Sequence, residues 1–361
     1  MENIVRLMME LPKSYEEESY KQGAIVRRRG VSRPADLMML SMFHLQNGCS
    51  LLEISEVARI TKLGNMSDVA FMNRFEKCGN WFRSINEQLA AKCLVDYEKP
   101  SYLQGKTVIA LDASDVAEKG RSGRIYRLNF ALDIFKMVSL EHKITTNKTG
   151  ESLSNFTMHP GYLAIADRCY TTIKGIQHCS ESGAEYIMRM RTNSFAVRDK
   201  FGEKIDLGEL FAKLGTEDTA DVTAFATNPR GDSVPVRICA RRKTAEAIEQ
   251  TKKKLKRRAT KKQQVVSEKA KTFNEYIVVV TNLDDSVSAN DILETYRLRW
   301  QVEIYFKRLK SILNFGELPK RRPGSVIAWL NGKMMVALLI EIVISKASFP
   351  PKEHDKQEHL A

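Results

Sequence analysis

The spacing of apolar residues changes near residue 105 and divides the chain into two kinds of sequence. Before this point the apolar positions recur at helical spacing, and Pro34 suits the first turn of a helix. Ser50 and Glu53 have the spacing of a capping box ahead of a further apolar run. We therefore predict an all-helical N-terminal domain over residues 1–100.

Two helices predicted within this domain follow one another across a turn that contains Gly64. The first begins after Ser50, and the second begins after Ser67 and runs to Phe75. A helix-turn-helix, which places its second helix in a DNA groove, has this outline. The turn is longer than is usual in that motif, and the second helix carries few basic side chains. A DNA-reading unit and a plain helical bundle are both compatible with this pattern.

Short apolar runs with strand-like composition replace the helical pattern after residue 105. The predicted strands are 107–112, 125–133, 137–146, 163–167, 185–191, 221–226, 234–240 and 276–282. The predicted helices are 172–179, 289–313 and 326–345. This order of elements predicts an α/β fold, in which helices flank a mixed sheet and a β-rich insertion interrupts it.

The length of 361 residues and the hydrophobic content of 43% are typical of a globular protein with more than one folding unit. We place the boundaries of these units where the pattern changes. The parts that follow the N-terminal domain are a first core segment, a β-rich insertion with a basic arm, a second core segment and a polar tail: 101–191, 192–284, 285–346 and 347–361.

Positive charge is concentrated in one part of the chain. The net charge is +13, and residues 241–271 contribute thirteen Lys and Arg against three Glu. Such a stretch can neutralise DNA phosphates, which makes a nucleic acid the expected partner. A solvated surface helix or a flexible arm accounts for the same composition, so charge alone leaves both interpretations open.

Other features of the sequence exclude several classes of protein. The six Cys residues include no C-x-x-C pair and no His partner at zinc-finger spacing, which favours a reduced, cytosolic protein without structural zinc. The N-terminus lacks the pattern of a signal peptide. The most apolar run, 334–344, contains Glu341 and is shorter than the ~20 residues of a membrane span, so we predict a buried helix and no membrane.

Three carboxylates are candidates for metal-dependent chemistry. Asp112 and Asp167 each end a predicted buried strand, and Glu303 lies on the helix predicted over 289–313. Carboxylate oxygens suit Mg²⁺, and two such ions can activate the attacking oxygen and stabilise the leaving oxygen in phosphodiester cleavage. An Asp after a strand also commonly begins a turn, and Asp115 and Asp133 have comparable positions. The two Asp residues are therefore weak evidence on their own.

A stripe of polar residues is predicted on the same long helix. Arg299, Glu303 and Lys310 follow Tyr296 by three, seven and fourteen residues, which places all four within an arc about 60° wide. Apolar residues flank this arc on both sides, which is unusual for a solvent-facing ladder of ion pairs. The spacing of Arg299 and Glu303 is also that of an ordinary i,i+4 salt bridge. A functional site and a structural ion pair both explain the stripe.

These four residues form the pattern Y-(2)-R-(3)-E-(6)-K, which resembles the signature of the DDE transposases of insertion sequences. Residues 163–170 are similar to that family's block around its second catalytic Asp, and residues 109–114 to the block around the first. The resemblance covers residues 105–345 and implies a ribonuclease-H-like core. It also implies a β-rich insertion between the second Asp and the Glu, in agreement with the long separation of Asp167 and Glu303.

The resemblance implies a role for each matching residue. Asp112, Asp167 and Glu303 would be the catalytic residues and would bind two Mg²⁺ ions, for which Mn²⁺ can substitute. Tyr296, Arg299 and Lys310 would contact the phosphates of the transposon end. The basic stretch would contact flanking DNA through Lys252, Lys253, Lys254, Lys256, Arg257 and Arg258.

The same resemblance implies a function. The protein would cleave DNA at transposon ends and transfer the 3′-OH strand to target DNA, and its N-terminal domain would recognise the terminal inverted repeats. Its partner would be double-stranded DNA, on which it would act as a homodimer. We expect it in the bacterial cytoplasm, associated with the nucleoid when bound.

Two departures from the family pattern keep an alternative open. Cys169 stands where a Gly is usual, and the family commonly continues with helical sequence beyond Phe349. A shortened, catalytically inactive transposase that binds element ends as a repressor would fit these departures. A ribonuclease-H-like nuclease or resolvase is a third alternative, against which the long insertion and the four-residue signature argue.

Overall fold

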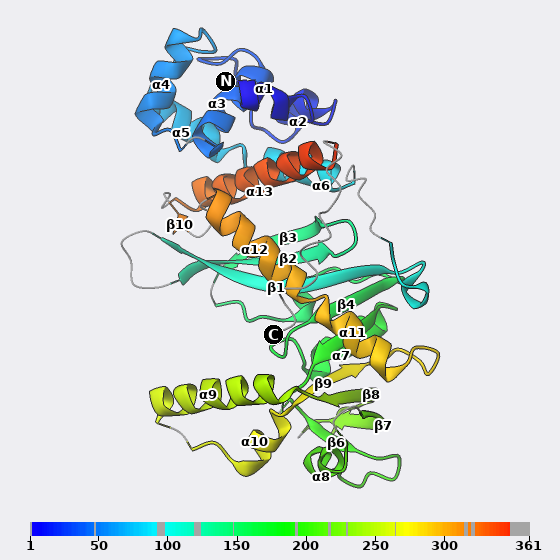
Figure 1. Ribbon diagram of the computed structural model, residues 1–361. Helices are drawn as coiled ribbons and strands as arrows, with labels where there is room; N and C mark the ends of the chain where they lie inside the picture. Colours follow the sequence, from blue (N-terminus) through cyan, green and yellow to red (C-terminus); the bar gives the residue numbers. More distant parts are fainter. Residues whose placement is uncertain are drawn as a thin grey trace. The chain divides into compact units, whose positions relative to one another are not determined.

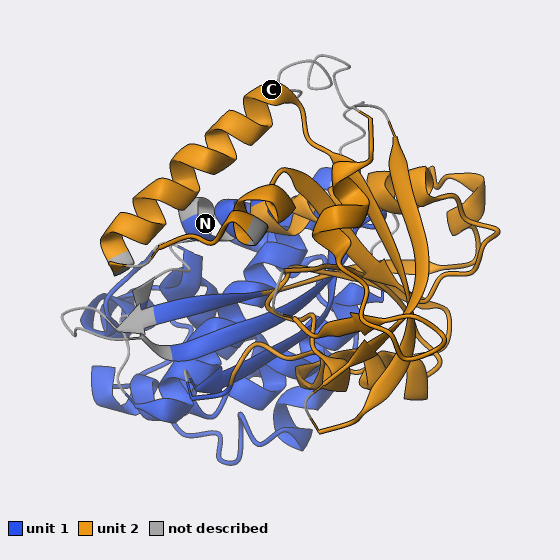
Figure 2. Ribbon diagram, turned by 90° about the horizontal axis from the view of Figure 1, so that it is seen from below, with its two compact units in different colours: residues 1–97, 113–149, 304–350 blue, residues 98–112, 150–303, 351–361 orange. Residues whose placement is uncertain are grey.

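The computed structural model describes residues 2–46, 48–91, 98–118, 124–146, 148–191, 194–215, 218–228, 230–263, 265–313, 317–318 and 322–346. The chain divides into two compact units, which Figure 2 shows in different colours. Unit 1 comprises residues 1–97, 113–149 and 304–350, and unit 2 comprises residues 98–112, 150–303 and 351–361. The predicted polar tail, 347–361, lies outside the described residues.

Unit 1 contains the predicted N-terminal helices together with the last long helix of the chain (Figure 1). These helices are α1 (Glu2–Met8), α2 (Tyr15–Lys21), α3 (Pro34–Gln46), α4 (Leu51–Ile60), α5 (Asp68–Glu76), α6 (Gly79–Ala90) and α13 (Pro323–Lys346). Ser50 and Glu53 form the predicted capping box of α4, and the Ser67 side chain caps α5. The helical prediction for this part of the chain is confirmed over its described residues.

Helix α13 is the core helix of unit 1. It is long and apolar enough to cross a membrane, but 72% of its most apolar window is buried inside the protein. It packs against α3, α5, α6 and β3 (Val138–Thr146), and Met334 and Leu339 on it are completely shielded from solvent. Burial of such side chains contributes roughly 1.5–3 kcal/mol each. The predicted buried helix is therefore confirmed.

The strands of unit 1 form one edge of the sheet. β2 (Arg124–Asp133) and β3 are antiparallel, and β10 (Glu317–Leu318) pairs in parallel with the end of β1 (Thr107–Glu118). Helix α12 (Trp300–Leu313) packs on β2, because the Tyr305 ring stacks on Phe130 with 5.2 Å between ring centroids. This contact fixes the part of α12 that follows Glu303 against the sheet.

Unit 2 contains strands in the order β1-β4-β5-β9-β8-β7-β6. These strands are β4 (Tyr162–Ala166), β5 (Glu185–Arg189), β6 (Ala196–Arg198), β7 (Thr219–Thr227), β8 (Ser233–Arg242) and β9 (Tyr276–Thr281). Its α-helices are α7 (Ile173–Glu181), α8 (Leu207–Ala212), α9 (Ala245–Lys262), α10 (Glu268–Phe273) and α11 (Ala289–Arg297), with short 3-10 helices at Ser101–Leu103 and Leu153–Asn155.

The direction of the strands in unit 2 changes at the insertion. β1, β4 and β5 are mutually parallel, and their apolar residues are buried, as expected for strands covered on both faces. β9 is antiparallel to β5, and β8, β7 and β6 follow it in antiparallel order. The β-rich insertion therefore continues the core sheet. The predicted fold class, a ribonuclease-H-like mixed sheet flanked by helices, is confirmed.

Two predicted elements differ from the structure by more than a few residues at their ends. β1 does not end at Asp112 but continues to Glu118, because Val116 is buried and the last residues of the strand pair with β10. The helix predicted over 289–313 is interrupted between α11 and α12, since the backbone forms turns at Leu298 and Arg299. The short elements β6 and α8 were absent from the sequence-based prediction.

Candidate active site

Neighbouring parallel strands place three charged residues side by side. Leu111 of β1 is in register with Ala166 of β4, and Ala166 is in register with Met188 of β5. The residues that follow on the three strands are Asp112, Asp167 and Arg189. Because adjacent strands lie about 4.8 Å apart, two carboxylates and a guanidinium originate from neighbouring backbone positions. All three residues are partly buried.

The chain beyond Asp167 is fixed by local hydrogen bonds. The Tyr170 N–H donates to the Asp167 carbonyl at 3.0 Å, and the Thr171 hydroxyl donates to the Arg189 carbonyl at 2.6 Å. Thr172 then caps α7 by accepting from the Gly175 N–H at 3.1 Å. These bonds connect the ends of β4 and β5, so Asp167 and Arg189 are held by a rigid support rather than by a free loop.

The turn between α11 and α12 changes the predicted stripe. The N–H groups of Leu298, Arg299 and Val302 donate to the carbonyls three residues earlier, not four. Such bonds tighten the turn and break the regular rotation of about 100° per residue on which the predicted arc depends. Tyr296 therefore lies on α11 and Glu303 on α12, and the four residues do not share one helix face as predicted.

The turn nevertheless brings three residues of the stripe into one electrostatic group. Nη2 of Arg299 donates to Oε1 of Glu303 at 2.6 Å. Burial alone lowers the pKa of Arg299, but Tyr296, Glu303 and Asp167 together raise it above its usual range. The exposed fraction is 15% for the Arg299 side chain and 55% for that of Glu303. Arg299 is thus a shielded cation that is bonded to Glu303 and interacts electrostatically with Asp167.

Tyr296 is the most buried member of this group. Its hydroxyl is shielded from solvent and has no hydrogen-bond partner among the described residues. Burial raises the pKa of Tyr296, while the nearby charges of Arg299 and Arg189 oppose the increase. The hydroxyl therefore stays protonated at neutral pH. It is a hydrogen-bond donor available to an acceptor that enters the site.

The three predicted metal ligands are not equally placed. Asp112 and Asp167 come from adjacent backbone positions, whereas the Glu303 carboxylate is engaged by Arg299. Within the part of the chain that the structure describes, no group of three His, Cys, Asp or Glu side chains is gathered to hold a metal ion. The donor set still has the chemistry that Mg²⁺ and Mn²⁺ require, since all three groups offer oxygen. Asp112 and Asp167 are thus neighbours, whereas Glu303 would have to leave Arg299 to act together with them.

Lys310 follows Glu303 by seven residues on α12, which places both side chains within about 20° on the same helix face. Lys310 is exposed. It therefore extends the polar face of α12 beyond Glu303.

Sequence reasoning missed a group of cations beside Asp167. Arg189 follows from the strand register, and Arg168 is the next residue after Asp167. Lys243 interacts with both: burial, together with the charges of Arg189 and Arg168, lowers the pKa of Lys243 to about 8. Its Nζ donates to the Asn274 carbonyl at 2.6 Å. The signal for Arg189 was its place near the end of a predicted strand, the criterion that selected both Asp residues.

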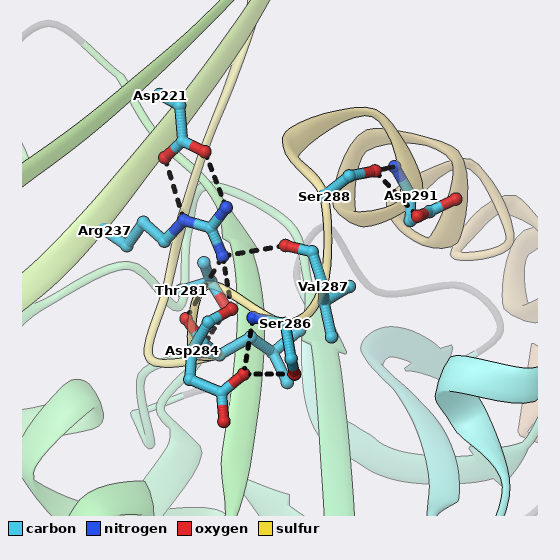
Figure 3. Close-up of polar contacts among 9 residues, drawn as sticks. Asp221, Arg237, Thr281, Asp284, Ser286, Val287, Ser288 and Asp291 are labelled. Carbon is cyan, nitrogen blue, oxygen red and sulfur yellow. Dashed lines mark hydrogen bonds and ion pairs between the residues drawn. The ribbon is translucent and has the colours of Figure 1, made fainter.

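A buried arginine anchors the segment that leads into α11 (Figure 3). Arg237 of β8 donates from Nε and Nη2 to the two carboxylate oxygens of Asp221, at 2.8 and 2.6 Å. Its Nη1 donates to the carbonyls of Asp284 and Val287 at 2.5 and 2.9 Å. Ser288 caps α11 immediately afterwards. The insertion therefore fixes the start of the helix that carries Tyr296.

The basic stretch forms helix α9, which Figures 1 and 2 show as a long helix separate from the sheet of unit 2. Lys252 pairs with Glu275 at 3.0 Å and Lys253 with Glu249 at 3.6 Å. The other four predicted DNA-binding cations are exposed and have no ion pair within the described residues: Lys254, Lys256, Arg257 and Arg258. The structure thus divides the six predicted residues into two with acidic partners and four that have none among the described residues.

Comparison with known proteins decides the family. The sequence profile described as "Transposase DDE domain" matches residues 104–339. The chain belongs to this family of DDE transposases. The family predicted from the sequence is thus confirmed, and with it an enzyme that cleaves and rejoins DNA strands.

Proteins with similar sequences are named as transposases of insertion sequence elements. The transposase for insertion sequence element IS421 of Escherichia coli is 26% identical over 350 residues, which cover 94% of this chain and 93% of the relative. The transposase for IS231E of Bacillus thuringiensis subsp. finitimus is 25% identical over 206 residues, which cover 53% of this chain and 43% of the relative. The alternative of an inactive repressor is not favoured, because the relatives are named as transposases.

Proposed function

We propose that this transposase cleaves DNA at the ends of an insertion sequence and joins the freed 3′-OH to target DNA. The observation that carries the proposal is the register that places Asp112 and Asp167 next to one another on parallel strands, with Arg299 close to Asp167 and bonded to Glu303. The adjacent carboxylates of Asp112 and Asp167 repel one another, and a bound metal cation would relieve that repulsion. A site of this kind suits the charge of a phosphodiester undergoing displacement.

Asp112, Asp167 and Glu303 would hold two divalent ions, Mg²⁺ or Mn²⁺. When bound, the ions would activate the attacking oxygen and stabilise the leaving oxygen. Glu303 would leave Arg299 to take part in binding. Its exposed side chain on the first turn of α12 has the freedom to do so, while the two Asp residues stay fixed by the sheet.

Exchange of partners by Glu303 frees Arg299 for the substrate. A guanidinium released from a carboxylate binds a phosphate through the same planar donors. The buried hydroxyl of Tyr296 lies close to Arg299 and offers a further donor to that phosphate. Arg189 and Lys310 add positive charge along the path of the DNA backbone. In this scheme Tyr296, Arg299 and Lys310 orient the DNA, and the carboxylates carry the chemistry.

Double-stranded DNA is the proposed partner, both as element ends and as target. Both ends of an element must be held while they are joined, so we propose a homodimer on DNA. The N-terminal domain, residues 1–100, would recognise the terminal inverted repeats. The bacterial cytoplasm is the proposed location, with binding to the nucleoid through DNA.

Removal of divalent metal tests the chemistry. Duplex DNA that carries the ends of the element is expected to be cleaved with Mg²⁺ or Mn²⁺ and left intact with excess EDTA, because the carboxylates alone cannot stabilise the leaving oxygen. Gel analysis of end-labelled DNA measures the cleavage. Restoration of cleavage by added Mg²⁺ controls for unfolding in EDTA. Cleavage that persists at full rate without divalent metal would contradict the proposed mechanism.

Salt dependence tests the role of α9. We consider the quadruple variant in which Lys254, Lys256, Arg257 and Arg258 are replaced with Gln. The plot of log K, the DNA association constant, against log salt is expected to become less steep by about 3.6, because each lost phosphate contact removes about 0.9 from its steepness. The double variant Lys252→Gln/Lys253→Gln is the control, and a smaller change is expected because Glu275 and Glu249 already engage these lysines. Fluorescence anisotropy with duplex DNA gives both slopes. An unchanged slope in the quadruple variant would assign α9 to solubility alone.

A further inference from the structure

Unit 1 contains a strongly basic cavity far along the sequence from the catalytic residues. Its volume is about 420 Å³, and it lies between the loop after α2 and the exposed side of α5. Half of its lining residues are cationic and none is acidic; the lining is Ala24, Val26, Arg27, Arg29, Ala70, Asn73, Arg74 and Lys77. A cavity with this lining attracts an anion.

The loop that supplies two of these arginines is fixed at both ends. Ile25 and Val31 are buried, with 2% and 0% exposure, so both ends of the loop are anchored in the core. The Asn65 N–H donates to the Gly30 carbonyl at 2.8 Å, and a Cβ on Gly64 would lie 2.4 Å from that carbonyl oxygen. This close approach joins the loop to the turn between α4 and α5, so the loop is held in place before any ligand arrives.

Arg74 fastens the middle of the same loop to α5. Its Nη2 donates to the carbonyls of Arg27 and Arg29 at 3.1 and 2.6 Å. The backbone of the loop is therefore turned toward α5, while Arg27 and Arg29 are exposed at the surface. Arg74 has a structural role here and adds its charge to the cavity.

The charge of this cavity is not balanced by the protein. Within the described residues, Arg27, Arg29, Arg74 and Lys77 form no ion pair, and Glu76 of α5 is engaged by a further cation, Arg322, at 3.9 Å. Other surface arginines of unit 1 do have partners: Arg59 pairs with Glu56 and Arg83 with Glu87. Clustered like charges destabilise a fold, so this cluster is better explained by a ligand than by structure.

We propose that this cavity binds backbone phosphates of double-stranded DNA. The inference rests on the proposed function, which makes duplex DNA the substrate. Beside the cavity, Val69 and Asn73 of α5 and its C-cap residue Lys77 form an exposed row at four-residue spacing, which continues one face of this short helix. Phosphate contacts fix the register of a protein on DNA, and the adjoining helix face then lies against the groove. The loop residues Arg27 and Arg29 add to the basic side chains that α5 and its C-cap supply through Arg74 and Lys77.

The experiment compares the full-length protein with two double variants that lose the same charge. Arg27→Gln/Arg29→Gln empties the cavity of its loop cations, and Arg6→Gln/Arg83→Gln removes two exposed arginines elsewhere in unit 1. The probe is a fluorescein-labelled duplex of about 30 base pairs, titrated between about 0.05 and 0.2 M salt. For the cavity variant, the plot of the log association constant against log salt is expected to become less steep by about 1.8. This variant is also expected to bind the duplex on the order of tenfold more weakly at about 0.1 M salt. The control variant is expected to keep the wild-type slope.

A second variant keeps the test decisive if folding is disturbed. Arg27→Lys/Arg29→Lys retains the charge and is expected to retain the slope, and thermal unfolding of each variant is followed by circular dichroism. An unchanged slope in a folded Gln variant overturns the inference, as does an equal loss in the control. Loss of binding to single-stranded RNA or to anionic vesicles, with duplex binding intact, also overturns it. If the slope changes as expected but wild-type protein does not cleave end DNA, the cavity assignment stands and the proposed function fails.

Discussion

Replacement of Asp167 with Asn is expected to lower metal-dependent cleavage of end DNA by at least about 10³-fold, or about 4 kcal/mol of transition-state stabilisation. Asp167 is fixed at the end of β4 beside Asp112 and close to Arg299, so an amide in its place removes a negative oxygen ligand without changing the support. Single-turnover cleavage in Mg²⁺ measures the loss. The affinity for duplex DNA is expected to stay the same or to increase, because a charge that repels phosphates is removed.

The matched control is Asp285→Asn, which makes the same chemical change at an exposed position in the segment before α11. Its cleavage rate is expected to equal that of the wild type. Glu303→Gln is expected to match Asp167→Asn in cleavage, since an amide is a poor ligand for Mg²⁺. Full cleavage by either active-site variant would refute the assignment of the three carboxylates.

Replacement of Arg237 with Met is expected to destabilise the protein by about 3 kcal/mol. The Arg237 side chain is 8% exposed, and its loss leaves the carbonyls of Asp284 and Val287 without their donor. Asp221 is 41% exposed, so water can solvate its carboxylate and the cost stays below that of a fully buried pair. Thermal unfolding is expected to shift down by roughly 6–12 °C.

Arg241→Met on the same strand provides the control. Arg241 pairs with Glu294 of α11 at 2.7 Å, but the two side chains are 26% and 40% exposed, so the expected loss is about 0–1 kcal/mol. A double-mutant cycle with Asp221→Asn separates the ion pair from the bonds to the carbonyls. Equal effects of Arg237→Met and Arg241→Met would show that the buried anchor has no special role.

Most of the helices and strands could be predicted from the sequence, because the spacing of apolar residues indicates which side chains of an element are buried. Strands β4 and β9 were predicted from short apolar segments of the sequence. Helices α4 and α5 were predicted from their N-cap residues, Ser50 and Ser67. The pairing of β9 with β5 was not visible, since no local pattern says which distant strands share hydrogen bonds. The insertion could therefore be predicted as β-rich, but not as a continuation of the core sheet.

The candidate site residues were selected from the sequence, but their arrangement in space was not. The family signature selected Tyr296, Arg299 and Glu303, and the structure couples them electrostatically. The break between α11 and α12 could not be read from the sequence, because apolar spacing carries through the turn. Arg189 was missed because its position beside Asp167 depends on strand register, which only the folded sheet defines.

The position of α13 has a consequence for synthesis of the protein. The N-terminal helices α3, α5 and α6 pack on a helix that ends at Lys346, so they emerge from the ribosome long before their core partner. Until α13 has been translated, the apolar side chains that pack on it lack that cover, although the N-terminal helices also contact one another, and such surfaces are prone to misfolding and aggregation. Only a ribosome that has translated α13 releases a chain able to complete unit 1, so translation interrupted before this helix yields polypeptides without the finished core of that unit.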